Sequence, residues 1–196
     1  NTQPTHPHAN HNLGVLLLDI GKINEATAFF KKAVESDSFQ PQFLASYISA
    51  LVDSNKGIAG DQLIATVSRN RDAIYYQKVA QALNNAGVKR KKSKLYGPAQ
   101  YLYYYALVFK PDYAAALNNL GNLSLEVKNM SVAYSSYKKS ICLEPQFLEP
   151  YMNLADYFFK EQKYVASLYI LYKSFKINPI SPLAYLNKGN ALTELG

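Results

Sequence analysis

The sequence has few of the residues on which catalysis usually depends. It contains one cysteine, Cys142, no tryptophan, and three histidines, His6, His8 and His11, all within the first eleven of its 196 residues. A single thiol excludes an internal disulfide, and inside an apolar run it is expected to be a small buried side chain. Since no histidine follows His11, no histidine elsewhere in the chain can serve as the base for a serine or cysteine nucleophile.

Motifs for metal and phosphate chemistry are also missing. No glycine-rich phosphate loop, HExxH pair or CxxC pair occurs. The three histidines could bind a divalent metal, because imidazoles are good ligands, but they lie at an end of the chain that is expected to fray. The sequence therefore predicts no catalytic residue, no metal site and no cofactor, and we expect this segment not to be an enzyme.

Long apolar runs are absent as well. No run approaches the ~20 apolar residues that a transmembrane helix needs. No signal-peptide pattern opens the chain, and its first residue is Asn1. These absences predict a soluble segment of a longer protein with no membrane partner, and the single cysteine fits a reducing, cytoplasmic compartment.

The net charge of +7 is concentrated in one part of the chain. The whole basic excess falls between Arg71 and Lys110, and the run KRKKSK spans Lys89–Lys94. Four tyrosines follow it closely: Tyr101, Tyr103, Tyr104 and Tyr105. Such a combination could bind single-stranded nucleic acid. We favour the alternative that the basic run ends a helix, where cations offset the helix dipole, and that the tyrosines pack a hairpin with their phenol groups reaching water.

What the sequence does contain is a repeat. Pro111, Pro145 and Pro179 are spaced 34 residues apart, and each follows a short apolar run. Proline cannot continue a helix and pushes the preceding residue toward extended geometry, so each marks a helix end. The predicted repeats are about 7–40, 41–79, 80–113, 114–147, 148–181 and 182–196, the last holding a first helix only. The repeat 41–79 is irregular and long, which predicts that the next helix starts early, near Asp72.

Within each repeat, residue size follows position. Positions 8, 20 and 27 are small and position 24 is bulky, as in Gly121, Ala133, Ser140 and Tyr137. This pattern and the period resemble the tetratricopeptide repeat (TPR) family. The resemblance implies an all-α, right-handed α-solenoid: one domain of about five helical hairpins and a final unpaired or capping helix. It also implies that the first helix of each repeat lines a concave groove.

Asparagine recurs at position 6: Asn12, Asn85, Asn119, Asn153 and Asn187. Only the irregular repeat differs, with Ser46. An amide carries donors and an acceptor, so a row of amides in the groove could hold the main chain of an extended peptide. The stretches ANHNLG and LNNLGN are similar to repeats in the TPR arm of O-GlcNAc transferase-type proteins, in which such a ladder holds substrate polypeptides. The alternative is that these asparagines only cap or solvate the inner wall.

Neighbouring groove positions are also polar. Position 5 holds Asn84, Asn118 and Met152, and position 9 holds Asn122, Asp156 and Asn190. No lysine stands at position 5, where TPR domains that bind chaperone C-termini carry one, so we do not expect that ligand.

Three functions remain open at this point. The first is a scaffold that binds a protein or an extended peptide through the asparagine ladder. The second is the substrate-recruiting arm of a larger O-GlcNAc-type glycosyltransferase or another transferase. The third, with least support, is nucleic-acid binding through residues 89–94. Exposed end helices could in addition pair two copies into a homodimer.

Overall fold

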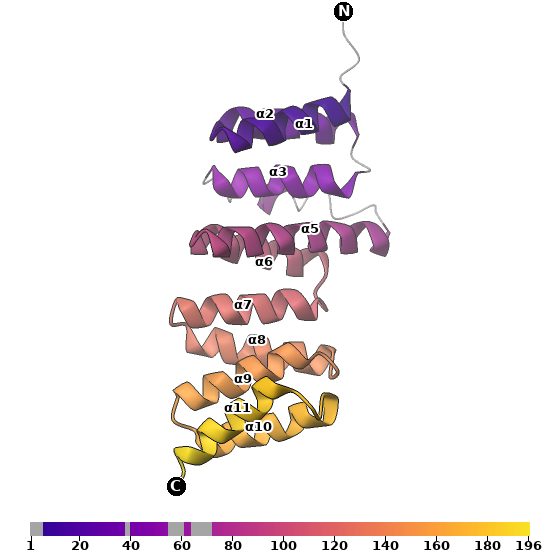
Figure 1. Ribbon diagram of the computed structural model, residues 1–196. Helices are drawn as coiled ribbons and strands as arrows, with labels where there is room; N and C mark the ends of the chain where they lie inside the picture. Colours follow the sequence, from indigo (N-terminus) through magenta and orange to yellow (C-terminus); the bar gives the residue numbers. More distant parts are fainter. Residues whose placement is uncertain (1–5, 38–39, 55–60, 64–71) are drawn as a thin grey trace, which may run out of the picture. The chain divides into compact units, whose positions relative to one another are not determined.

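The computed structural model describes residues 6–37, 40–54, 61–63 and 72–196, and all regular structure in these ranges is helical (Figure 1). The bounds are α1 (Pro7–Asp19), α2 (Ile23–Ser36), α3 (Pro41–Asp53), α5 (Ala73–Lys92), α6 (Tyr96–Phe109), α7 (Ala114–Glu126), α8 (Met130–Leu143), α9 (Leu148–Lys160), α10 (Tyr164–Ile177) and α11 (Pro182–Thr193). The predicted all-α architecture of helical hairpins is confirmed.

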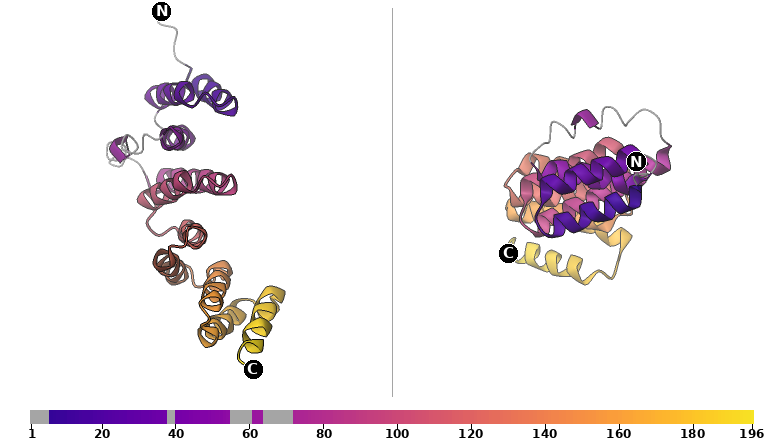
Figure 2. Two further views of the ribbon diagram at one scale, coloured as in Figure 1. Left: turned by 90° about the vertical axis from the view of Figure 1, so that its left-hand side faces the viewer. Right: turned by 90° about the horizontal axis from the view of Figure 1, so that it is seen from above.

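The chain divides into two compact halves. The N-terminal half is Asn1–Pro111 and the C-terminal half is Asp112–Gly196. In the first, α1 pairs with α2 and α5 with α6, while α3 packs against α2 and α5. In the second, α7 pairs with α8 and α9 with α10, and α11 packs against α10 and α9 (Figures 1 and 2).

Helix starts follow the expected period. α7, α9 and α11 begin at Ala114, Leu148 and Pro182, which are the first residues of three predicted repeats. Helix α5 is the exception: it begins at Ala73, and the Asp72 side chain caps it by accepting the Tyr75 N–H at 2.7 Å. The early start expected near Asp72 is therefore confirmed. The second helix expected in the repeat 41–79 lies mostly outside the described residues.

Three hairpins are closed by a ring lying directly on a glycine. A Cβ added at Gly14 would lie 2.7 Å from the nearest Phe30 ring carbon, at Gly87 2.7 Å from Tyr103, and at Gly121 2.5 Å from Tyr137. Real Cβ atoms essentially never approach so closely, so these hairpins require glycine at position 8 where position 24 is aromatic. In the hairpin of α9 and α10, Ala155 stands in place of the glycine and Leu171 in place of the ring.

The other small positions are buried as predicted. Their residues are Ala26, Ala99, Ala133 and Ser167 at position 20, and Ala33, Ala106, Ser140 and Ser174 at position 27. The serines keep hydrogen bonds inside the core: Ser140 Oγ donates to Ala114 O and Ser167 Oγ to Ala155 O, both at 2.8 Å. A buried hydroxyl that bonds a helix carbonyl avoids the cost of lost hydration.

The turn inside each hairpin has one backbone form. Position 15 is left-handed in Gly21 (φ 78°), Lys94 (60°), Lys128 (60°) and Gln162 (58°). Around Lys128, its own N–H bonds Leu125 O at 3.1 Å and the Asn129 N–H bonds Ser124 O at 2.7 Å. These two bonds make a Schellman motif, which satisfies the last carbonyls of the first helix.

Two expectations about side chains are wrong. Cys142 is exposed rather than buried, because it points away from the core face of α8. Tyr103 and Tyr105 are fully buried and their phenol groups do not reach water, whereas Tyr101 and Tyr104 are 53% and 56% exposed. Burial, together with a hydrogen bond to Asp61, raises the pKa of Tyr105. Among the described residues, no helix combines the length and apolarity needed to cross a bilayer.

Replacing Gly121 by alanine tests the ring contact. The new methyl group must displace the Tyr137 ring, so we expect a loss of about 1–3 kcal/mol in the free energy of unfolding. Gly189→Ala is the matched control, because Gly189 also stands at position 8 of a first helix and an added Cβ there meets nothing within 4 Å. Thermal unfolding with amide exchange of α7 and α8 measures both. Equal stability of the two variants would contradict the contact.

Replacing Lys128 by glycine tests the turn. Relief of left-handed strain, roughly 1–2 kcal/mol, should exceed the entropy that glycine adds to the unfolded chain, for a net gain of about 0.5–1 kcal/mol. The same exchange at Lys139, exposed inside α8, should instead cost about 1 kcal/mol. Chemical denaturation of both variants gives the comparison, and a loss at Lys128 would rule out the strain.

Candidate functional site

First helices in the N-terminal half surround an open cavity of about 400 Å³. It is called the N-terminal pocket below. Its lining comes mainly from α1, α3 and α5: Val15, Leu18, Phe30, Gln42, Ala45, Ser46, Ser49, Ala82, Asn85, Ala86, Lys89 and Arg90. The predicted site residue Asn85 is exposed there, and Ser46, at the same repeat position, is half-buried beside it. The pocket thus combines an apolar wall with amide and hydroxyl groups.

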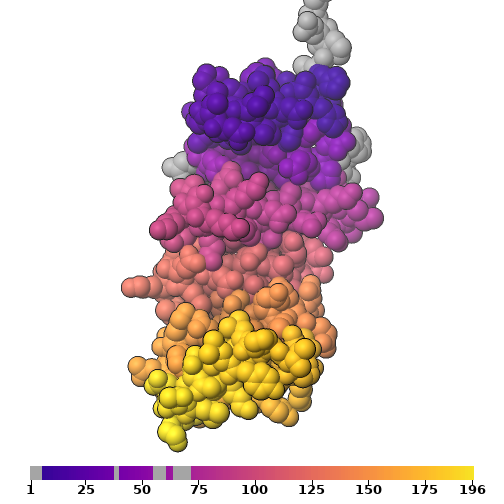
Figure 3. All heavy atoms as spheres, in the orientation of Figure 1, coloured from indigo at the N-terminus to yellow at the C-terminus, as the bar shows by residue number. Residues whose placement is uncertain are grey.

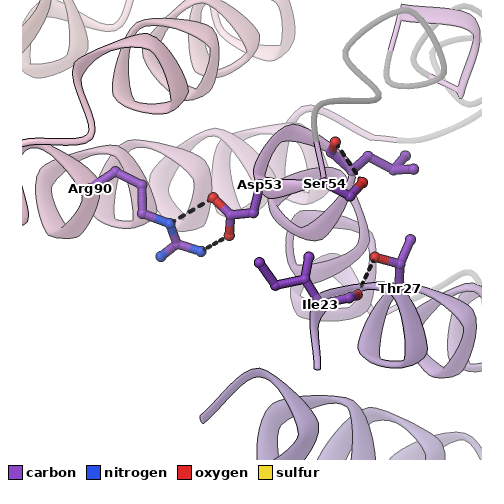
Figure 4. A network of polar contacts seen from close by, with 6 residues as sticks. Ile23, Thr27, Asp53, Ser54 and Arg90 are labelled. Atoms are coloured by element: carbon purple, nitrogen blue, oxygen red, sulfur yellow. Dashed lines mark hydrogen bonds and ion pairs between the residues drawn. The ribbon is translucent and has the colours of Figure 1, made fainter. Parts of the chain in front are cut away.

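An ion pair supports one side of this pocket. Arg90 Nε donates to Asp53 Oδ1 at 3.0 Å and Arg90 Nη2 donates to Asp53 Oδ2 (Figure 4). The side chains are only 20% and 11% exposed. The expectation of a fully solvated basic turn is therefore wrong for Arg90, which ties α5 to α3. Lys89, Lys92 and Lys94 are exposed, as expected.

His11 is held between helices rather than offered to solvent. Its Nε2 lies 3.0 Å from Ser46 Oγ, and its ring centroid lies 4.9 Å from that of Phe43 and 5.4 Å from that of Phe30. Burial lowers the pKa of His11, partly offset by a hydrogen bond to Asn12. His8 also packs edge-on against Phe43, at 5.1 Å. Within the described ranges, no three His, Cys, Asp or Glu side chains gather as a metal site.

Two predicted site residues in the C-terminal half bind each other. Asn153 Nδ2 donates to Asn118 Oδ1 at 2.8 Å, joining α9 to α7. The pair occupies the same repeat positions as Ser46 and His11, position 6 of one repeat against position 5 of the preceding one. At two places, therefore, position 6 bridges successive hairpins. The bond uses one amide hydrogen of Asn153 and leaves its carbonyl oxygen for other contacts.

Other predicted amides are also part of the fold. Asn122 Oδ1 accepts a hydrogen bond from Tyr137 Oη at 2.7 Å, inside the hairpin of α7 and α8. Burial, with the carboxylates of Asp156 and Glu126, raises the pKa of Tyr137, so the phenol is a neutral donor. Asn84 and Asn118 are only 5% and 7% exposed. They therefore do not form the open polar wall that the sequence predicted for them.

A second, smaller cavity of about 80 Å³ lies in the C-terminal half. This C-terminal pocket is lined by Ala155, Asp156, Phe159, Ser167, Asn187 and Asn190. Three predicted site residues from α9 and α11 therefore meet there: Asp156, Asn187 and Asn190. Lys160 Nζ lies 2.7 Å from Asp156 Oδ2 and balances its charge. Of the remaining predicted residues, Asn12 is exposed on α1 and Asn119 is half-buried on α7.

Lowering the pH tests the environment of His11. The pKa of His11 is lowered in the fold, so the unfolded chain takes up a proton first as the pH falls through about 6.5. The free energy of unfolding therefore decreases as the pH falls through that value. We expect the N-terminal half to lose stability between about pH 7.5 and 5.5, and His11→Gln to lose less. Amide exchange of α1 and α3 across this range measures the difference, and parallel pH profiles would contradict the assignment.

Comparison with known proteins agrees with the geometry. Residues 7–39 match the sequence model of the tetratricopeptide repeat family. No curated protein sequence matches the chain. PilF from Pseudomonas aeruginosa is 22% identical, with 96% of this chain and 84% of PilF covered and a TM-score of 0.55.

Two shorter TPR domains are similar as well. The first TPR domain of Spaghetti (RPAP3), bound to the HSP90 peptide SRMEEVD, is 18% identical, with 61% of this chain and 94% of that chain covered and a TM-score of 0.58. The Sgt2 TPR domain from Aspergillus fumigatus is 16% identical, with 59% of this chain and 78% of that chain covered and a TM-score of 0.56. The chain therefore has the helical-hairpin fold of TPR proteins, and its first hairpin carries that family's sequence pattern.

Proposed function

We propose that this chain is a protein-binding scaffold in which each half holds a short extended stretch of polypeptide against its first helices. The observation that carries the proposal is the N-terminal pocket, where Asn85 and Ser46 lie beside an apolar wall in a cavity of about 400 Å³. A TPR domain of similar fold, that of Spaghetti, is bound to a peptide. That likeness is one of fold alone, and the pocket itself is what supports binding in this chain.

The chemistry of the N-terminal pocket suits main chain more than particular side chains. The Asn85 amide can bond a peptide group of an extended ligand, and the Ser46 hydroxyl has capacity for one further hydrogen bond beside its contact with His11 Nε2. Each such bond contributes only about 0.5–1.5 kcal/mol net, while Val15, Leu18 and Phe30 offer apolar contact. Lys89 at the margin disfavours basic ligands. The expected binding is weak and broad in sequence.

The proposal revises the asparagine ladder. Asn118, Asn122 and Asn153 already make side-chain hydrogen bonds within the fold, so each has fewer polar atoms left for a ligand than an amide that lines open space. Asn85 in the N-terminal pocket, and Asn187 and Asn190 in the C-terminal pocket, line open space instead. We infer two separate contact sites rather than one continuous row of amides.

The alternative functions differ in how well these contacts support them. A substrate-recruiting arm of a larger transferase would use the same surfaces, and it stays a prediction that the downstream coding sequence can test. Nucleic-acid binding has less support, because Arg90 is committed to Asp53 and the rings of Tyr103 and Tyr105 are buried. Homodimerisation through the end helices also stays a prediction.

Asn85→Ala tests the proposal. With a reduced and alkylated unfolded protein as the probe, we expect the variant to bind about two- to tenfold more weakly by fluorescence anisotropy, the loss of one hydrogen bond. Gln77→Ala is the control, because Gln77 is exposed on the same helix and does not line the pocket. Equal affinities of the two variants would remove Asn85 from the site, and no capture by the native chain would remove the function.

A further inference from the structure

One side of α10 carries tyrosine and lysine side chains that neither pocket uses. Val165, Tyr169 and Tyr172 are 70%, 58% and 62% exposed, and Lys173 and Lys176 are exposed beside them. Residues 165, 169, 172 and 176 are spaced four, three and four apart, so they lie along one side of the helix. The opposite side packs against α9 and α11, and Figure 3 shows α11, in yellow, at the front of the C-terminal half. The five exposed residues are called the outer face of α10 below.

This exposure does not depend on residues that follow α11. The same repeat positions, 18, 22 and 25, hold Ser131, Ser135 and Lys138 in α8. All three are exposed although the hairpin of α9 and α10 follows them. A further hairpin therefore leaves this side of a second helix open. Where α8 has two serines and a lysine, α10 has a valine and two tyrosines.

Charge on the second helices of the C-terminal half is unbalanced. Helices α8 and α10 contain no aspartate or glutamate, but they contain Lys138, Lys139, Lys173 and Lys176. Among the described residues, none of these lysines has a carboxylate partner. Helix α2 shows the balanced arrangement, in which Lys31 Nζ lies 3.6 Å from Glu35 Oε1 one turn away. The second helices α8 and α10 thus leave their positive charge open to an acidic group from outside.

Two of these lysines lie over tyrosine rings. Lys173 Nζ is 4.6 Å from the centroid of the Tyr169 ring, and Lys176 Nζ is 5.2 Å from that of the Tyr172 ring. Each ring holds an ammonium group near its face. The ammonium and the phenol hydroxyl can both donate to carboxylate oxygens. A nucleobase stacking on the same ring face would instead have to displace the ammonium.

The N-terminal half contains a comparable contact. In α6, positions 22 and 25 hold the exposed tyrosines Tyr101 and Tyr104, whose ring centroids lie 6.2 and 5.7 Å from that of Tyr105. The Tyr105 phenol has a hydrogen bond with Asp61, which lies outside the hairpin of α5 and α6. Tyr105 stands at position 26, where α10 has Lys173. A carboxylate approaching α10 in the same way would meet an ammonium group, so charge complementarity favours an acidic occupant.

A lipid surface and a second copy of the chain fit this face less well. Helices that lie on membranes bury a stripe of bulky apolar side chains, whereas α10 offers one valine and two tyrosines. A second copy would have to supply unpaired carboxylates. In the C-terminal half, Asp156 and Glu161 already pair with Lys160 and Lys163.

We propose that the outer face of α10 binds an acidic segment of a partner protein. Carboxylates of the segment contact Lys173 and Lys176, and its apolar side chains lie on Val165 and the tyrosine rings. This binding is distinct from peptide capture by the first helices, because no residue of the outer face lines the N-terminal or the C-terminal pocket.

The probe is a short synthetic peptide of glutamates around one phenylalanine, added to the isotope-labelled full chain. We expect saturable NMR shifts in the amides of residues 164–177. Binding should weaken as the salt concentration rises, because exposed charges are screened. A peptide with lysine in place of every glutamate should not bind there.

Matched variants make the test specific. Lys173→Gln combined with Lys176→Gln should weaken binding of the acidic peptide about five- to tenfold, the loss of two exposed charge contacts. The control is Lys31→Gln combined with Lys32→Gln, because both lysines are exposed on α2 and the change in net charge is the same. It should leave the affinity within about twofold. Tyr169→Ser, which gives α10 the residue of α8 at this position, should weaken binding about threefold.

Several results would overturn the proposal: no saturable shifts in residues 164–177, equal losses in the two double variants, or equal binding of the lysine peptide. Circular dichroism checks that every variant keeps its helical content.

The other occupants have their own probes, which are oligothymidylate and vesicles of phosphatidylserine with phosphatidylcholine. Tighter binding of either one than of the acidic peptide, lost in Lys173→Gln with Lys176→Gln, would assign the outer face to nucleic acid or to lipid and exclude the acidic segment. A dimer in sedimentation that the same double variant dissociates would assign it to a second copy of the chain.

Discussion

The close approach of the two helices in a hairpin is the constraint on which the rest of the structure depends. A ring lying directly against a glycine sets the distance between them at Gly14, Gly87 and Gly121. Small residues at positions 20 and 27 are buried in the same hairpins. Once that distance is fixed, the first helices can lie next to one another and form a pocket. The proposed binding surface thus depends on a packing rule that acts elsewhere in the repeat.

Polar contacts between hairpins follow a second rule. Ser46 with His11, and Asn153 with Asn118, join position 6 of one repeat to position 5 of the preceding one, 35 residues earlier. The same type of side chain that could grip a ligand thereby holds neighbouring hairpins in place. A repeat protein has only a few residues on this face, so fold and binding compete for them. Asn85 lines an open cavity, and we propose that it serves binding rather than the fold.

The sequence predicts the backbone of this protein far better than its polar contacts. Period and proline spacing locate the starts of α7, α9 and α11, and the extra residues before Ala80 anticipate the early start of α5. Contacts such as that of Arg90 with Asp53 depend on how one hairpin is rotated against the next, which a single sequence does not encode locally. The burial of Tyr105 is hard to predict for a similar reason, because α6 contacts α3 as well as its hairpin partner α5. A search for polar residues one repeat plus one apart would have found the 35-residue pairs.

The turn at position 15 has a consequence for how the sequences of such repeats diverge. The backbone is left-handed at all four of these positions: Gly21, Lys94, Lys128 and Gln162. Only Gly21 is a glycine, which adopts these angles without steric strain. The hydrogen bonds of this turn offset the strain that lysine or glutamine has in the left-handed conformation. The amino acid at this position can therefore change while its backbone geometry stays fixed. The common origin of these hairpins is thus easier to recognise in the path of the main chain than in the sequence.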